Sequence, residues 1–300
     1  MKRLFSLVLF ILGTAGLVAC TAHPTEQQMG VTILGSGGYY ESPVWAPDGM
    51  SIAVAHSDEN GKTQIEVLDN RGKQIYAVPR TSGILTSPGW KGTQVLFLES
   101  AASPVYLRLS TVSDVETLAD VSGTALASWS QDGRWGVLLQ GGDGGPSRLR
   151  LLDTSTLKSR VLGFDKAPFR FRLSPSGRFL AFVRQDSTGG TLAVQDLESG
   201  DVQDLWHVPY SEAVLGDITW APNEKWVGVR RGRGEKNNGF YVLPRQGSAE
   251  PRLLTPIDMV SPDWSPDGKH IVYTTVGSPG ANELRLLTVD IELLKVLAGN

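Results

Sequence analysis

The chain has 300 residues, with 28 basic and 31 acidic side chains and a formal net charge of −3 at pH 7, a balance that excludes a general attraction to nucleic acid or anionic lipid. Its 34 glycines and 17 prolines are typical of a chain with many tight turns. Because there is a single cysteine, no internal disulfide can form and the fold must be stable through its core.

The first twenty residues predict a secretory signal peptide. Lys2 and Arg3 precede an apolar stretch of about 15 residues, which is shorter than the roughly 20 residues needed to cross a bilayer. The stretch ends at Cys20, and its last residues, LVAC, resemble the bacterial lipobox. That resemblance implies that diacylglycerol is attached to Cys20 and, because Thr21 and not Asp follows, that the lipoprotein is sorted to an outer membrane where one exists. The alternative is an ordinary signal peptide that happens to contain a cysteine.

Residues 21–30 are polar, contain a proline and show no periodicity, which indicates a tether. Ten such residues span about 33 Å when fully extended and roughly 20 Å as a coil, so the folded part, residues 31–300, is expected to work close to the membrane. Without Lys2 and Arg3 the mature chain keeps 26 basic and 31 acidic side chains, a net charge of −5.

An internal repeat predicts the fold of residues 31–300. A small residue or proline, a tryptophan, a turn and an apolar run recur with a spacing of about 44 residues. The six copies centre on Trp45, Trp90, Trp129, Leu173, Trp220 and Trp264. After each copy, two short alternating strands are joined by a polar turn, as in LRLLDTSTLKSRVL. Each unit thus supplies four strands, here called a to d from the inside outwards, and six such units predict an all-β, six-bladed β-propeller.

The turn in the last unit shows why the motif has this composition. In Pro266-Asp267-Gly268, proline presets φ, aspartate can accept a hydrogen bond from the backbone beyond it, and glycine takes a positive φ. The preceding tryptophan is expected to wedge against the neighbouring blade. The turn aspartates Asp48, Asp132 and Asp267 are therefore expected to be structural.

These residues closely resemble the WD40-like PD40 repeat of TolB-type propellers, and the resemblance covers all six units. The second unit has Lys91-Gly92-Thr93 in place of Pro-Asp-Gly, the fourth has Leu173 in place of tryptophan, and the fifth has Pro222-Asn223-Glu224, so altered turns are expected there. Nothing in the sequence matches the α/β domain that precedes the propeller in TolB itself, so TolB's partners are not implied. Residues 31–34 and 291–297 both resemble an outermost strand, and the prediction is that the two ends of the chain meet in the last blade.

Catalytic and cofactor signatures are mostly missing from the sequence. No paired cysteines or H-E-x-x-H motif predicts zinc, and no G-x-S-x-G motif predicts a hydrolase elbow. We therefore expect no cofactor and no metal. An enzyme acting on glycan or peptide, a hydrolase or lyase, remains the alternative, and it requires ionisable groups to converge at the channel mouth. The candidates for such a set are Arg172, His207, Asp217 and Asp258.

Propellers usually bind ligands through the d–a and b–c connections on one face. Two kinds of loop are candidates here. The fifth b–c connection is basic, and several d–a connections combine aromatic residues with arginine or histidine, a composition typical of binding hot spots. The tentative binding residues are Tyr39, Tyr40, Arg170, Arg172, His207, Tyr210, Arg230, Arg231 and Arg233. A solvated basic loop and half-buried strands are the structural alternatives.

The sequence therefore favours an exported, lipid-anchored propeller that binds a protein, peptide or glycan on the periplasmic side or outer surface of the envelope. A monomer without a nucleic-acid partner is expected.

Overall fold

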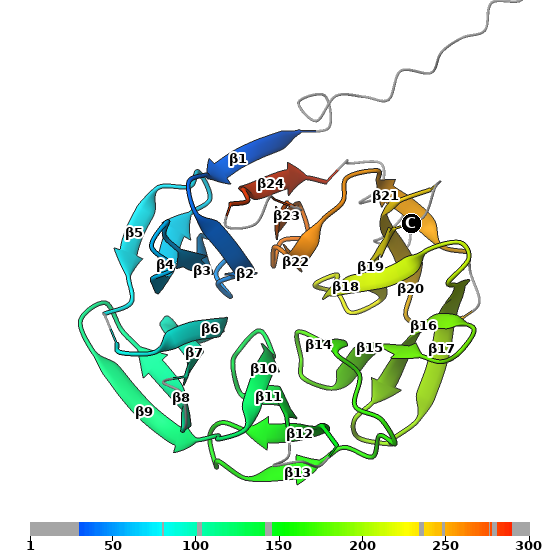
Figure 1. The fold of residues 1–300 in the computed structure, drawn as a ribbon, viewed down its shortest axis with the longest axis horizontal. Helices are drawn as coiled ribbons and strands as arrows, with labels where there is room; N and C mark the ends of the chain where they lie inside the picture. Colours follow the sequence, from blue (N-terminus) through cyan, green and yellow to red (C-terminus); the bar gives the residue numbers. More distant parts are fainter. Residues whose placement is uncertain are drawn as a thin grey trace, which may run out of the picture.

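The computed structural model describes residues 30–79, 81–100, 104–141, 146–233, 237–247, 250–275, 277 and 281–289. All regular structure in these residues is β, and it forms six antiparallel sheets of four strands arranged as a ring around a central channel (Figure 1). The predicted six-bladed propeller is confirmed.

The first three blades follow the chain in order, each from its innermost to its outermost strand. Blade 1 contains β2 (Tyr39–Trp45), β3 (Ser51–Ser57), β4 (Thr63–Asp69) and β5 (Gln74–Ala77). Blade 2 contains β6 (Ile84–Lys91), β7 (Gln94–Ser100), β8 (Val105–Ser110) and β9 (Val115–Asp120). Blade 3 contains β10 (Thr124–Trp129), β11 (Trp135–Gln140), β12 (Arg148–Asp153) and β13 (Ser159–Val161).

The last three blades continue the same order, except that blade 6 takes its outermost strand from the start of the chain. Blade 4 contains β14 (Arg170–Leu173), β15 (Phe179–Gln185), β16 (Gly189–Asp196) and β17 (Val202–Pro209). Blade 5 contains β18 (Val214–Trp220), β19 (Trp226–Gly232), β20 (Gly239–Pro244) and β21 (Arg252–Thr255). Blade 6 contains β22 (Val260–Trp264), β23 (His270–Thr274), β24 (Leu284–Thr288) and β1 (Val31–Gly35).

The turn between the two inner strands of each blade forms as its sequence dictates. In blade 6 the Asp267 carboxylate accepts hydrogen bonds from the Lys269 amide at 3.0 Å and the Ser265 hydroxyl at 2.6 Å, and Gly268 has a φ of 76°. Asp48 and Asp132 accept the same backbone bond in blades 1 and 3, so the structural role expected of the turn aspartates is confirmed. In blade 5 the altered turn places Glu224, and not a glycine, in the left-handed region at a φ of 56°.

The core is divided among the blade interfaces. Six apolar clusters each join the inner strands of one blade to those of the next. Buried tryptophans add a bond across three of these interfaces: Nε1 of Trp90, Trp129 and Trp220 donates to a backbone carbonyl in the innermost strand of the preceding blade, at 3.2, 2.8 and 3.0 Å. The predicted wedge of tryptophan against the neighbouring blade is confirmed there. Leu173 replaces the tryptophan in blade 4, and its amide donates instead to Ser128 Oγ of blade 3 at 3.0 Å.

The ring closes where the start of the chain meets the last blade. β1 pairs antiparallel with β24, with Val31 opposite Leu287, so the N-terminal strand is the outermost strand of blade 6. Residues 291–297, the other candidate for this position, lie outside the described residues, as do residues 1–29 with Cys20 and most of the tether. Within the described ranges, no helix is long and apolar enough to cross a membrane.

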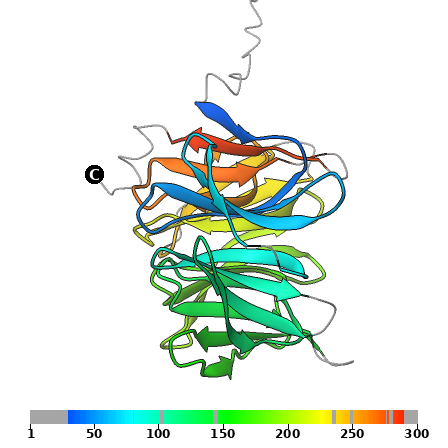
Figure 2. The ribbon, with the colours of Figure 1, turned by 90° about the vertical axis from the view of Figure 1, so that its left-hand side faces the viewer.

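The disc has two faces, which the edge-on view separates (Figure 2). The mouth face carries the connections that lead into the innermost strands, such as Phe169 before β14 and Asp258 before β22. The turn face carries the turns that leave those strands, such as those at Asp48 and Asp267. Gly30 belongs to the turn face, because its carbonyl accepts the Thr288 amide at 3.1 Å while the next amide, Val289, bonds to Lys269 beside the turn of blade 6.

Candidate functional site

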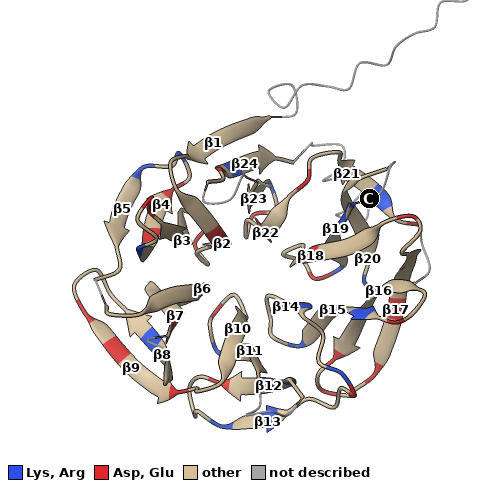
Figure 3. Ribbon diagram, in the orientation of Figure 1, with Lys and Arg blue, Asp and Glu red and all other residues tan. Residues whose placement is uncertain are grey.

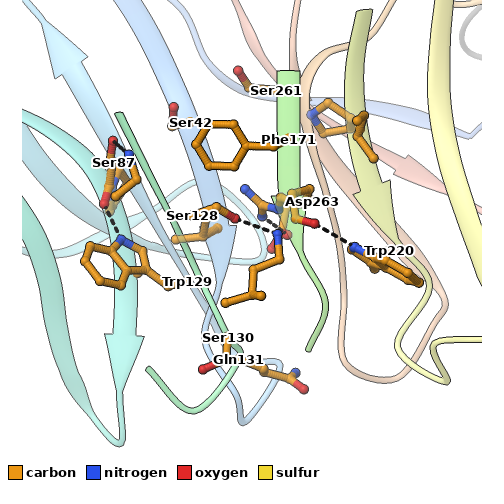
Figure 4. A pocket seen from close by; sticks show the side chains of 18 of the residues that line it. Ser42, Ser87, Ser128, Trp129, Ser130, Gln131, Phe171, Trp220, Ser261 and Asp263 are labelled. Carbon is orange, nitrogen blue, oxygen red and sulfur yellow. Dashed lines mark hydrogen bonds and ion pairs between the residues drawn. The ribbon is translucent and has the colours of Figure 1, made fainter. Parts of the chain in front are cut away.

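The innermost strands enclose a cavity of about 210 Å³ in the central channel. It extends from Phe169 at the mouth face to Gln131 and Pro175 at the turn face. Its charged lining residues are Arg170, Arg172, Asp217 and Asp263. Serine side chains supply much of the remaining polar lining, and all of them are labelled in Figure 4; they are Ser42, Ser87, Ser128, Ser130 and Ser261.

One ion pair joins two blades that are not neighbours. Arg172 in β14 of blade 4 donates to the Asp263 carboxylate in β22 of blade 6. The second Asp263 oxygen accepts the Trp45 amide of blade 1 at 2.8 Å. Only 17% of the Asp263 side chain is exposed, and this burial raises the pKa of its carboxyl above the usual range, although the Arg172 guanidinium and the Trp45 N–H act in the opposite direction.

A second set of charges alternates in sign along the mouth face. Asp217 in β18 lies 3.8 Å from Arg170 and 3.5 Å from Arg230, and Arg230 also donates to Asp258 in the connection before β22. The set therefore links blades 4, 5 and 6. In Figure 3 the innermost strands of these blades carry charged segments beside the channel, whereas β10 of blade 3 carries none.

The entrance to the cavity combines an apolar and a charged residue that are both open to solvent. Phe169 is 63% exposed, and the side chain of Arg170 is 52% exposed. Arg172 lies two residues further along β14, its side chain is 23% exposed, and it forms an ion pair with Asp263. Exposed aromatic and arginine side chains above a desolvated charge are the elements of a binding hot spot. Arg170 and Arg172 are thus the predicted residues that the structure brings to the channel.

Tyr39 and Tyr40 do not line the cavity. Both belong to β2, and Tyr40 is only 6% exposed, stacked on His56 with ring centroids 4.3 Å apart. Asn282 holds the Tyr40 backbone from blade 6, accepting its N–H at 2.7 Å and donating to its carbonyl at 2.9 Å. Tyr40 therefore holds blade 1 against blade 6, and its ring is buried between Gly35 and His56 and not exposed to solvent.

The basic loop expected at residues 230–236 is not a single loop. Arg230 and Arg231 lie within β19, and because successive strand residues point to opposite faces, they separate. Arg230 joins the charges at the mouth, whereas Arg231 is 7% exposed and donates to the Asn237 carbonyl at 2.9 Å and to Glu212 at 3.4 Å. Arg233 follows the strand and is exposed, and residues 234–236 lie outside the described part of the chain.

His207 and Tyr210 lie at the rim of blade 4. His207 belongs to β17, the outermost strand, and its Nδ1 is 2.9 Å from Thr191 Oγ1. It therefore does not converge with Arg172, Asp217 and Asp258 at the channel, which removes one member of the expected catalytic set. Tyr210, 45% exposed, follows β17 on the mouth face.

Sequence reasoning missed Asp263, although a signal was present. At the position just before the aligned tryptophan, the six units carry Val44, Gly89, Ser128, Arg172, Thr219 and Asp263. Only the fourth and sixth units have a charge there, and the charges are opposite. Comparing equivalent positions around the ring therefore indicates the pair.

Over the described ranges, no group of three or more His, Cys, Asp or Glu side chains is placed so as to hold a metal ion.

Comparison with known proteins agrees with this architecture. No family model matches the chain. One curated protein, the Tol-Pal system protein TolB of Hydrogenovibrio crunogenus, is 30% identical over 74 residues, which are 24% of this chain and 17% of that protein. The matched segment thus spans less than a fifth of that relative.

Solved structures extend the similarity to the whole ring. TolB from Acinetobacter baumannii superposes with a TM-score of 0.57 at 16% identity, covering 86% of this chain and 65% of that one. An oligogalacturonate lyase in complex with manganese superposes with a TM-score of 0.61 at 13% identity, covering 88% of this chain and 94% of the lyase. The chain therefore has a six-bladed β-propeller fold that is similar to the propeller of TolB.

Proposed function

We propose that the protein is a lipid-anchored, protein-binding module of the bacterial cell envelope and that its partner binds at the mouth face. The observation that carries the proposal is the cavity of about 210 Å³ beneath exposed Phe169 and Arg170, with ion pairs from three blades around it, of which Arg172–Asp263 is mostly buried. The similarity to TolB, a protein of the Tol-Pal system, supports an envelope setting.

The position of the tether supports the same proposal. Gly30 and Val31 lie at the turn face, at the outer edge of blade 6. A chain lipidated on Cys20 is therefore attached to the membrane from the face opposite the charged cavity. This geometry leaves the mouth free for a partner that approaches from the side away from the membrane.

An affinity pull-down from detergent-solubilised membranes tests the binding surface. The double variant Phe169→Ser/Arg170→Glu changes two exposed residues at the mouth, and we expect it to recover at least tenfold less partner, because aromatic and arginine anchors at a hot spot each contribute about 2 kcal/mol or more. The matched control is Met50→Ser/Lys269→Glu, which makes the same kinds of change at exposed positions of the turn face. Equal recovery by both variants would place the partner elsewhere.

The alternative function is an enzyme that acts on glycan or peptide at the same mouth. The observation that favours it is Asp263, a buried carboxyl with a raised pKa in a cavity, in a fold shared with oligogalacturonate lyases. Incubation with oligogalacturonate, with and without Mn²⁺, tests this function. Appearance of an unsaturated product with the parent protein but not with Asp263→Asn would support the enzyme.

A further inference from the structure

The cavity is too small for most ligands and the right size for a side chain. Pockets for small molecules usually measure about 300–1,000 Å³, whereas this one measures about 210 Å³. Its polar lining includes a wall of serine hydroxyls from blades 1, 2, 3 and 6, the guanidinium groups of Arg170 and Arg172 from blade 4, and the carboxylates of Asp217 and Asp263. The occupant that fits is one polar side chain, and not a sugar chain.

Two of the serine hydroxyls are left as hydrogen-bond donors. Ser87 Oγ accepts the Ala127 amide at 3.1 Å, and Ser128 Oγ accepts the Leu173 amide at 3.0 Å. Both side chains are 4% exposed and line the cavity (Figure 4). No acceptor for either hydroxyl hydrogen occurs within the described ranges. A hydroxyl that already accepts from the backbone offers its hydrogen to a ligand, and such donors favour an anion.

The backbone is strained where it presents this wall. Ser42, Ser87 and Ser261 have φ values of 50°, 51° and 46°, and each precedes a proline. A non-glycine residue held in this region costs about 1–3 kcal/mol, and such strain gathers at functional sites. At all three positions the register of the innermost strand shifts, which is the signature of a β-bulge that re-aims side chains.

Arg172 already holds a carboxylate, which the chain itself supplies. Asp263 reaches Arg172 from the other side of blade 5, and its burial raises the pKa of its carboxyl, so an ionised Asp263 is poorly solvated there. A second carboxylate entering the cavity can take over Arg172, and Asp263 can then accept a proton. Its other bond, from the Trp45 amide, is kept by the protonated form as well.

We propose that this cavity binds the carboxylate of a single Asp or Glu side chain of the partner, with Arg172 as the pairing cation and the hydroxyls of Ser87 and Ser128 as donors. Asp263 is paired with Arg172 until the partner's side chain binds, so Asp263 competes with that side chain for Arg172. The inference rests on the proposed function, because the acidic side chain belongs to the protein that binds at the mouth.

Binding of labelled poly-L-glutamate to the full-length protein in detergent tests the inference, with poly-L-glutamine as the uncharged probe. We expect binding of poly-L-glutamate only. Arg172→Gln is expected to weaken it at least tenfold. Asp263→Asn keeps an acceptor for the Trp45 amide but releases Arg172, and it is expected to tighten binding about tenfold. Arg184→Gln removes an equal charge at an exposed ion pair of β15 and is expected to change nothing.

Four results would overturn the inference. The first is equal binding of the two polymers. The second is an Asp263→Asn variant that binds poly-L-glutamate no more tightly than the parent does. This second measurement can be made even if Arg172→Gln fails to fold. The third is binding of oligogalacturonate without poly-L-glutamate, which would assign the site to a sugar acid. If Arg172→Gln still recovers the membrane partner that Phe169→Ser/Arg170→Glu loses, the carboxylate site is refuted while the proposed function stands.

Discussion

At the scale of single residues, aspartates stabilise the turns between strands by accepting hydrogen bonds. A carboxylate oxygen of Asp69 accepts the amides of Lys73 and Arg71, both at 2.9 Å. These bonds hold the pKa of Asp69 below its usual value. Hydrogen bonds also lower the pKa values of five other turn aspartates. The main donor is a backbone amide at Asp58 and Asp153, a hydroxyl at Asp120 and Asp186, and the Arg178 guanidinium at Asp196.

The lowered pKa values predict how stability depends on pH. A carboxyl with a lowered folded-state pKa stabilises the fold above its unfolded-state pKa, and this stabilisation is lost as the pH falls through the folded-state value. We therefore expect the urea midpoint to fall between neutral pH and about pH 3. Asp69→Asn keeps an acceptor oxygen but does not titrate, so its midpoint should fall less over the same range. An equally steep fall in the variant would contradict this role for Asp69.

The sequence predicts such local bonds well and distant partners poorly. Asp267 could be assigned to its turn because proline and glycine flank it, and the bond it forms reaches only two residues along the chain. Arg172 and Asp263 are 91 residues apart, and Arg230 and Asp258 are 28 apart, so nothing local indicates either pair. The run of basic residues predicts a loop at Arg231, whereas in the structure Arg231 lies in β19 and donates to Glu212 and to the Asn237 carbonyl.

At the scale of elements, the tryptophan repeat both identified the blades and explains how they adhere. The indole N–H of Trp129 bonds to the Ser87 carbonyl of blade 2 at 2.8 Å. Two tryptophans differ: Trp264 Nε1 bonds within its own turn, to the Gly268 carbonyl at 2.7 Å, and Trp45 Nε1, although Trp45 is only 5% exposed, has no hydrogen-bond partner within the described structure. At the Trp45 interface the Asp263 carboxylate, which accepts the Trp45 amide, and the Asn282 side chain, which bonds to the Tyr40 backbone, provide cross-blade bonds.

This difference provides a matched pair of substitutions. Trp129→Phe removes a buried hydrogen bond and leaves a carbonyl without its donor, whereas Trp45→Phe removes ring volume alone. We expect Trp129→Phe to lower the free energy of unfolding by about 1 kcal/mol more than Trp45→Phe does. Urea unfolding followed by circular dichroism measures both values. Equal costs would mean that the indole N–H bonds do not contribute to blade adhesion.

Ring closure shows where sequence periodicity stops being informative. Two segments, 31–34 and 291–297, have the alternation of an outermost strand, and alternation alone cannot rank them. The pairing of Val31 with Leu287 and the burial of Leu34 at 7% exposure give β1 that position. The choice depends on contacts between the two ends of the chain, which no local pattern records.

At the scale of the whole molecule, the fold places the proposed point of membrane attachment and the proposed binding surface on opposite faces. The strand that follows the tether starts at the turn face, and the ion pairs and the cavity open at the mouth face. Because the innermost strands run from one face to the other, the start of β1 and the mouth of the cavity are separated by the thickness of the disc. A lipid on Cys20 would thus leave Phe169 directed away from the membrane.

Site-specific photocrosslinking in cells tests this arrangement most directly. A benzoylphenylalanine is placed at Phe169 on the mouth face or at Met50 on the turn face, two positions that are 63% and 70% exposed. We expect a discrete protein adduct from position 169 and none from position 50. A protein adduct from position 50 alone, or none from either position, would contradict partner binding at the mouth.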